Sequence, residues 1–173
     1  VSEHADIKQT IPAIVFGAVG TAGQRCTSTR RLIVQASIYQ ELKQKLIATY
    51  NQIRIGDPLD EKNHMGPLID KAAVSEYSNA IMKASNEGGV VLCGDKILEG
   101  SAFISGCYVR PTIIEATVDM NMIQNETFAP ILYLLKYDTL EEAIEIQNSV
   151  SQGLSSSIFT LNSRESEFFL STL

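Results

Sequence analysis

The five residues from Ile131 to Leu135 are all apolar, without the alternation of a strand that has one face in solvent. A strand with this pattern is buried on both faces, so that its sheet is covered by other elements above and below. Four more runs are predicted as strands, and they cover residues 32–34, 90–92, 109–114 and 156–160. The centre of the fold is therefore expected to be a sheet.

Helical patterns separate these strands. Four helices are predicted, each with a polar residue at its start: Ser37, Asp70, Thr139 and Asn162. The first carries apolar side chains four residues apart as far as Tyr50, and the second ends at residues 87–89, where glycine can adopt a left-handed conformation. Strands separated by helices predict an α/β fold, with a mostly parallel open sheet and helices on both faces.

Length and composition restrict the class of protein. A chain of 173 residues is expected to form one domain. Its net charge of −6 argues against a nucleic-acid partner, because phosphate binding needs a basic patch. The longest apolar run, residues 11–19, is interrupted by Pro12 and Gly17 and is too short to cross a membrane. Three irregularly spaced cysteines form neither a disulfide framework nor a zinc site, which favours a reducing compartment.

One of these cysteines lies in an unusual setting. Cys26 follows a glycine-rich turn, residues 20–23, and three arginines lie within five residues of it: Arg25, Arg30 and Arg31. Nearby positive charge lowers the pKa of a thiol and so increases its reactive thiolate form. The residues alone leave two interpretations open, a reactive thiol and a buried, inert cysteine. Cys93 and Cys107 have no such setting and are interpreted as structural.

A second candidate segment, residues 125–130, immediately precedes the Ile131 strand. A carboxylate such as Glu126 can accept hydrogen bonds from paired sugar hydroxyls, and the Phe128 ring can lie against a planar heterocycle. Taken alone, this signal is weak, and Glu126 is better explained as a solvated surface acid and Phe128 as an ordinary core residue.

Together, six blocks of sequence carry a resemblance to a known family: residues 23–30, 56–59, 65–69, 106–112, 125–130 and 153–160. They begin with Gly-Gln-Arg-Cys and include Asn-Glu-Thr-Phe-Ala-Pro. In this order and at this spacing, the chain resembles the aldehyde dehydrogenase superfamily along nearly its whole length. The Gly-Thr-Ala-Gly-Gln-Arg-Cys and Phe-Ala-Pro forms are similar to the antiquitin branch.

The resemblance implies a role for each matching residue. Cys26 corresponds to the nucleophile that attacks the aldehyde. Glu126 corresponds to the residue that binds the nicotinamide ribose of NAD, and Phe128 to the ring beside the nicotinamide. Arg25 corresponds to an arginine that holds the polar end of α-aminoadipic semialdehyde, an intermediate of lysine breakdown, although a structural ion pair would also explain it. The resemblance further implies a homo-oligomer, either a dimer or a tetramer.

Other parts of the family's site have no counterpart in this sequence. These are the glutamate general base, the asparagine oxyanion donor, the NAD-binding domain and the C-terminal segment; no Gly-x-Gly-x-x-Gly loop occurs. We therefore expect residues 1–173 to be a partial catalytic domain, cut at both ends from a longer protein and inactive alone. Its source compartment is expected to be the cytoplasm, the mitochondrion or both.

The sequence leaves two other functions open. A cysteine acyl hydrolase would use the same thioester chemistry, but it needs a histidine base, and neither His4 nor His64 lies in a supporting motif. A non-catalytic protein on a dehydrogenase scaffold, as some lens crystallins are, would be favoured by loss of Cys26 or Glu126. Both residues are present. The exact aldehyde and the choice between NAD and NADP are not encoded in these residues.

Overall fold

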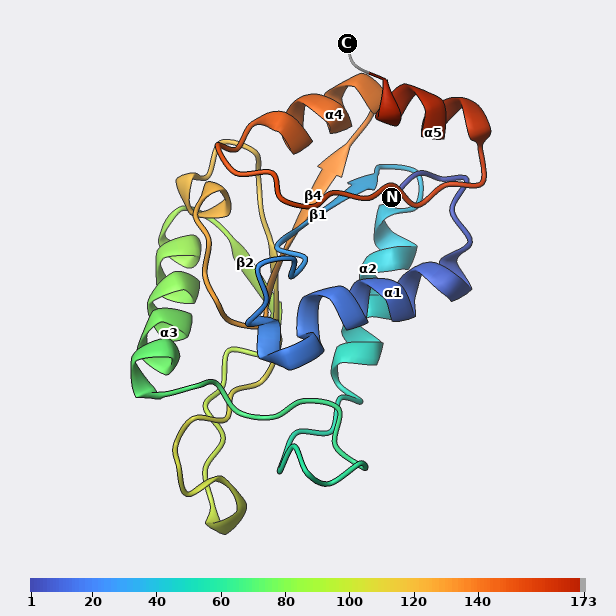
Figure 1. Ribbon diagram of the computed structural model, residues 1–173. Coiled ribbons are helices and arrows are strands. Elements are labelled where there is room, and N and C mark those ends of the chain that lie inside the picture. Colours follow the sequence, from blue (N-terminus) through green and yellow to red (C-terminus); the bar gives the residue numbers. More distant parts are fainter. Residues whose placement is uncertain (172–173) are drawn as a thin grey trace.

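The apolar run from Ile131 forms β4 (Ile131–Tyr137), an inner strand of a four-stranded sheet in the computed structural model, which describes residues 1–171 (Figure 1). The strand order is β1-β4-β3-β2, with β1 (Arg31–Gln35) and β3 (Thr112–Glu115) both parallel to β4. The outer strand β2 (Val90–Cys93) is antiparallel to β3. Residues 131–135 are all buried, as the pattern predicts, and the sheet is mostly parallel.

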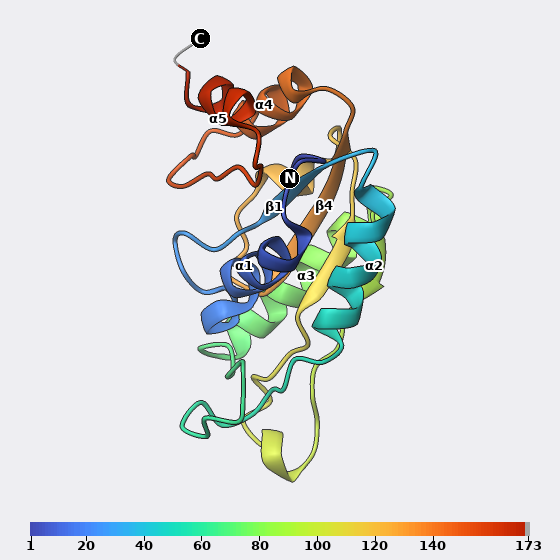
Figure 2. The ribbon, with the colours of Figure 1, turned by 90° about the vertical axis from the view of Figure 1, so that its right-hand side faces the viewer.

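Helices cover both faces of this sheet, which confirms the predicted fold class. α1 (Ile7–Val19) and α2 (Tyr39–Tyr50) lie on one face and α3 (Lys71–Asn86) on the other (Figures 1 and 2). α4 (Leu140–Asn148) contacts β1 and β4, and α5 (Ser163–Leu170) follows it. Three short 3₁₀ helices complete the elements: η1 (Gly20–Gly23), η2 (Ser101–Phe103) and η3 (Asn121–Gln124). No helix among residues 1–171 is long and apolar enough to cross a membrane.

Three of the four predicted helix starts are confirmed by their capping bonds. The side chain of Asp70 accepts a hydrogen bond from the Ala73 N–H at 2.8 Å. The side chains of Thr139 and Asn162 accept comparable bonds at the starts of α4 and α5. These bonds satisfy N–H groups that have no partner within the helix. The end of α3 is also as predicted, because Gly88 has a φ of 97°.

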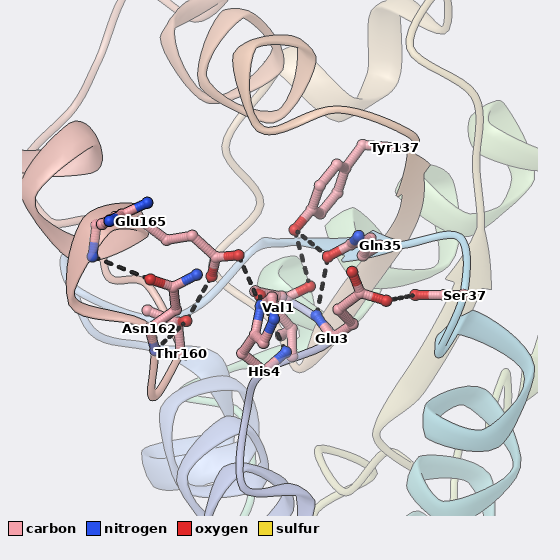
Figure 3. A network of polar contacts seen from close by, with 11 residues as sticks. Val1, Glu3, His4, Gln35, Ser37, Tyr137, Thr160, Asn162 and Glu165 are labelled. Atoms are coloured by element: carbon pink, nitrogen blue, oxygen red, sulfur yellow. Dashed lines mark hydrogen bonds and ion pairs between the residues drawn. The ribbon is translucent and has the colours of Figure 1, made fainter.

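The prediction that Ser37 caps a helix is wrong. α2 begins at Tyr39, its N-cap residue is Ile38, and no side chain caps it. The Ser37 hydroxyl instead donates a hydrogen bond to the Glu3 carboxylate at 3.0 Å (Figure 3). A hydrogen bond to an acid that is distant in sequence therefore replaces the helix cap that the local pattern predicts.

The predicted strand at residues 156–160 does not form. This stretch lies beyond the β1 edge of the sheet, beside the N-terminal residues. Around it, the Ser2 N–H donates to the Phe159 carbonyl and the Leu161 N–H donates to the His4 carbonyl, both at 3.0 Å. Side chains hold the same region, since Glu165 bonds to His4 at 2.8 Å and to Thr160 at 2.5 Å (Figure 3). Two backbone bonds are too few to make a ladder strand.

Two further differences concern proline. The strand predicted from Val109 begins only at Thr112, because Pro111 has no N–H to donate to a ladder.

None of the patterns above predicts α1, although Asp6 caps it by accepting hydrogen bonds from the N–H groups of Lys8 and Gln9. Pro12 lies inside this helix. Its apolar positions 7, 11, 14 and 18 have helical spacing, which is the signal that could have identified it.

Candidate active site

The loop that joins α1 to β1, residues 20–30, is called the nucleophile loop here because it carries Cys26. It begins with three consecutive residues in the left-handed region: Thr21 (φ 55°), Ala22 (φ 53°) and Gly23 (φ 68°). For a residue with a side chain, this conformation costs about 1–2 kcal/mol. Strain of this kind is found most often at functional sites.

Tight packing holds the loop in place at two glycines. A Cβ atom on Gly23 would lie 2.3 Å from the Ala129 carbonyl oxygen, and one on Gly17 would lie 2.5 Å from the Thr29 hydroxyl oxygen. Thr29 also donates its backbone N–H to the Gly17 carbonyl at 2.9 Å. The loop is therefore fixed between α1 and the segment that precedes β4.

Cys26 lies at the second position of a turn in this loop. The Ser28 N–H donates to the Arg25 carbonyl at 3.1 Å and closes the turn. The Cys26 side chain is exposed, and its own backbone N–H has no hydrogen-bond acceptor within residues 1–171. A nucleophilic thiol and a free N–H thus belong to the same residue.

Cys26 lines a cavity of about 580 Å³. Cys26, Ser28 and Arg30 line it from the nucleophile loop, and Glu126 lines it from the segment before β4. Further lining residues come from α1, β1, η3, α4 and residues 150–159. Two residues that are 100 positions apart in sequence therefore share one cavity.

Arg30 joins the two segments that carry these residues. Its guanidinium donates hydrogen bonds to the carbonyls of Gly23 (2.8 Å), Arg25 (3.2 Å) and Ala129 (3.1 Å). Its Nη2 also lies 3.8 Å from the Glu126 carboxylate. Burial lowers the pKa of Arg30, and the Glu126 charge opposes that effect. Arg30 nevertheless remains cationic at neutral pH, because a guanidinium loses its proton only in strongly basic solution.

The predicted cofactor residues both remain accessible. Glu126 keeps 51% of its side chain exposed, and the Phe128 ring is 40% exposed. The Arg30 guanidinium lies 5.1 Å from the centre of that ring, a cation–π distance. Cys26 and Glu126 thus line the same cavity, whereas Phe128 does not line it and is connected to both through its contact with Arg30.

The three arginines near Cys26 have different surroundings. The Arg30 guanidinium bonds to the carbonyls of Gly23 and Arg25 in the nucleophile loop. The Arg31 guanidinium donates to the carbonyls of Ile146 (2.8 Å) and Gln147 (2.9 Å) near the end of α4. Arg25 is exposed, lies 5.5 Å from the Phe16 ring on α1, and does not line the cavity.

The other candidate groups lie outside this site. Cys107 is buried, and Cys93 is partly buried in β2, where burial raises the pKa of its thiol. His4 pairs with Glu165, and the ring of His64 accepts a hydrogen bond from the Arg54 N–H at 3.1 Å. Neither histidine lines the cavity. Within residues 1–171, no three acidic, histidine or cysteine side chains gather as a metal site would require.

Comparison with known proteins identifies the family. The sequence profile described as "Aldehyde dehydrogenase family" matches residues 1–173. This chain belongs to the aldehyde dehydrogenase family. Among its relatives, a putative aldehyde dehydrogenase family 7 member A1 homolog from Caenorhabditis elegans is 49% identical over 165 residues, which are 94% of this chain and 30% of that protein. The alpha-aminoadipic semialdehyde dehydrogenase of Mus musculus is 46% identical over 159 residues, 91% of this chain and 29% of that protein.

Solved structures of aldehyde dehydrogenases have the same fold. The 3,6-anhydro-L-galactose dehydrogenase in complex with NAP superposes with a TM-score of 0.93 at 32% identity, over 97% of this chain and 35% of that one. The betaine aldehyde dehydrogenase of Staphylococcus aureus in complex with NAD⁺ also has a TM-score of 0.93, at 26% identity and the same coverage of this chain. This chain spans about a third of the length of these aldehyde dehydrogenases.

The sequence places Arg30 in a motif near Cys26 but does not predict which groups its guanidinium contacts. Its acceptor at Ala129 is 99 residues away, and Glu126 is almost as distant. Local spacing cannot reveal such partners. The available signal is an arginine directly before a buried strand with no acidic residue near it in sequence.

Proposed function

We propose that this chain supplies the nucleophile and part of the cofactor contacts of an NAD-dependent aldehyde dehydrogenase. The single observation that carries the proposal is that Cys26 and Glu126, from distant parts of the sequence, line one cavity. Membership of the aldehyde dehydrogenase family supports the same reaction class.

In the proposed reaction, the Cys26 thiolate attacks the aldehyde carbon, so that a C–S bond forms and the carbonyl π pair moves to oxygen. The Cys26 backbone N–H is free to donate a hydrogen bond to that oxyanion. When bound, NAD⁺ accepts the hydride that leaves the carbon as the carbonyl re-forms. Cys26 then carries a thioester, and attack by water releases the acid and restores the thiolate.

The residues near the thiol fit the nicotinamide end of NAD. The Glu126 carboxylate is half exposed and 3.8 Å from Arg30, which leaves it able to accept hydrogen bonds from two ribose hydroxyls. The Phe128 ring presents an accessible aromatic face. The solved structures with NAD⁺ and NAP bound support a nicotinamide dinucleotide as the cofactor.

We propose α-aminoadipic semialdehyde as the substrate, because the mouse relative bears that name. This aldehyde carries a carboxylate and an ammonium group at its far end, so its recognition requires charged side chains. The Arg25 guanidinium has no carboxylate partner within residues 1–171, which argues against a structural ion pair, and it does not line the cavity that Cys26 lines. The family resemblance supports its role in binding the substrate carboxylate.

We further propose that the 173 residues alone do not oxidise aldehydes. The relatives are about three times longer, and the resemblance assigns the general base, a second oxyanion donor and most of the cofactor site to their other parts. Loss of one oxyanion donor lowers the rate about a hundredfold or more. Aldehyde-dependent NADH formation by the isolated chain, abolished in Cys26→Ala, would contradict this proposal.

The alternative of a cysteine acyl hydrolase loses support, because a histidine base would have to contact Cys26. Neither histidine lines the cavity. No observation favours a purely structural protein, since the thiol of Cys26 and the carboxylate of Glu126 are both accessible.

The test uses the full-length protein that carries these residues, with NADH formation measured by absorbance. Cys26→Ala is expected to abolish activity, and the matched control Cys93→Ala, in β2, is expected to retain it. Arg25→Gln should raise KM for α-aminoadipic semialdehyde but not for hexanal, which has no charged end. Activity in Cys26→Ala refutes the proposed mechanism, whereas equal effects of Arg25→Gln on both aldehydes refute only the proposed substrate contact.

A further inference from the structure

The Arg30 guanidinium lies between the nucleophile loop and the segment before β4. Only 17% of the Arg30 side chain is exposed, and its guanidinium lies beside two accessible side chains, those of Glu126 and Phe128. All three of its hydrogen bonds go to backbone carbonyls, two in the nucleophile loop and one at Ala129. A planar guanidinium with several fixed donors can hold such a set, whereas a lysine ammonium cannot match its geometry.

The bond to the Arg25 carbonyl bears directly on Cys26. The Arg25 carbonyl and the Cys26 N–H belong to one peptide group, which is planar and trans. Two donors hold that carbonyl oxygen, the Arg30 Nη2 at 3.2 Å and the Ser28 N–H at 3.1 Å. The Cys26 N–H must therefore point the opposite way, away from Arg30, and hydrogen bonds to the carbonyl also polarise the N–H of the same peptide group.

The remaining contacts of Arg30 fix the other half of the site. It bonds to the Ala129 carbonyl, lies near the Glu126 carboxylate and stacks on the Phe128 ring. These three residues belong to one short segment before β4. A single side chain thus sets the distance between the thiol and the side chains proposed to bind the cofactor.

One polar atom of Arg30 has no partner in this arrangement of residues 1–171. Its Nε is buried without a hydrogen-bond partner within residues 1–171, and the Tyr133 hydroxyl is in the same condition. An unpaired buried polar atom in a native protein calls for an explanation, and function is a common one. Arg31 also lines the cavity, but its guanidinium bonds to carbonyls at the end of α4 and, within residues 1–171, donates no hydrogen bond to the nucleophile loop.

We propose that Arg30 is a positioning residue of the dehydrogenase: through the Arg25 carbonyl it aims the Cys26 N–H at the aldehyde oxygen, and through Ala129, Glu126 and Phe128 it sets the thiol opposite the nicotinamide. This inference rests on the proposed function. It predicts that loss of the guanidinium geometry lowers kcat more than it raises the KM for the aldehyde.

The experiment compares Arg30→Lys with the matched control Arg31→Lys in the full-length protein. Both variants replace a half-buried arginine that bonds to backbone carbonyls, so both lower the melting temperature. Arg30→Lys should lower kcat about a hundredfold, as expected for a misaligned oxyanion donor and thiol, with little change in the KM for the aldehyde. Arg31→Lys should keep kcat within about threefold of wild type, because a lost structural contact alone leaves transition-state interactions intact.

Guanidinium rescue gives a second readout that a purely structural role would not produce. In Arg30→Ala, added guanidinium ion at a non-denaturing concentration should restore part of kcat, whereas the same concentration should not raise kcat in Arg31→Ala. If Arg30→Lys does not fold, rescue of Arg30→Ala decides the question.

The outcomes separate the two proposals. Equal kcat values for Arg30→Lys and Arg31→Lys, or no rescue of Arg30→Ala, in a protein whose wild-type activity depends on Cys26, would overturn the positioning role alone. Absence of Cys26-dependent NADH formation in the wild-type protein would overturn the proposed function and this inference with it.

Discussion

Substitution of Gly23 by alanine tests whether the nucleophile loop depends on its close contact with the segment before β4. Gly23 has a φ of 68°, and an added Cβ would lie 2.3 Å from the Ala129 carbonyl oxygen and 2.5 Å from its carbon. No side-chain rotation can relieve this clash, because both atoms belong to the backbone. The loop and the segment must separate.

The expected loss of stability has two parts. A left-handed conformation costs alanine about 1–2 kcal/mol more than glycine, and forcing an atom into a packed contact costs about 1–3 kcal/mol. Gly23→Ala should therefore lower the free energy of unfolding by about 2–5 kcal/mol. Separation of the Gly23 and Ala129 carbonyls would also break at least one bond to Arg30, so activity should fall as well.

Gly88→Ala is the matched control. Gly88 also has a left-handed φ of 97°, but nothing lies within 4 Å of the Cβ that alanine would add. It therefore bears only the conformational cost. Urea unfolding of both variants isolates the steric part as the difference between them, and equal losses of stability would refute the argument that close contact holds this loop.

Two further predictions concern single groups. Iodoacetamide should alkylate exposed Cys26 faster than the less accessible Cys93 and Cys107 in the folded protein, and mass spectrometry that finds equal labelling of all three would contradict the assigned site. Burial tends to raise the pKa of Glu115, but hydrogen bonds from Lys43 and Tyr39 outweigh it and leave this pKa below its ordinary value. Because the folded pKa is the lower one, the stabilisation is present above the unfolded pKa of about 4.3 and is lost as the pH falls through the folded pKa. Urea unfolding of Glu115→Gln between neutral and acidic pH should thus show a weaker pH dependence than wild type, and an unchanged dependence would show that this carboxylate does not contribute.

The sequence predicts best where a local pattern and its partner are close together. Asp70 and Thr139 cap the helices assigned to them because each acceptor is three residues from its N–H donor. The apolar run at Ile131 predicts a doubly buried strand, and residues 131–135 are all buried in β4. These elements were sufficient for the fold class.

Prediction fails where a distant residue competes for the same group. Ser37 had the right spacing for a cap, but its hydroxyl bonds to Glu3. The role of Arg30 depends on Ala129 and on Glu126, which only the folded chain brings near. Cys26 and Glu126 themselves were identified through a family resemblance, since residue chemistry alone left an inert alternative for each.

The pairing of β1 with β4 has a consequence for the chemistry at Cys26. The nucleophile loop leads into β1, and the segment with Glu126 leads into β4, so two neighbouring parallel strands carry the two halves of the site at their starts. Their register, in which Arg31 pairs with Tyr133, fixes the relative position of the two halves of the site along the sheet. A slip of one residue would shift the thiol by about 3.3 Å along the sheet and move each buried side chain of β1 to the opposite face, where the packing is made for a different residue. The hydrophobic side chains that resist such a slip therefore set the geometry in which a bond to Cys26 can form.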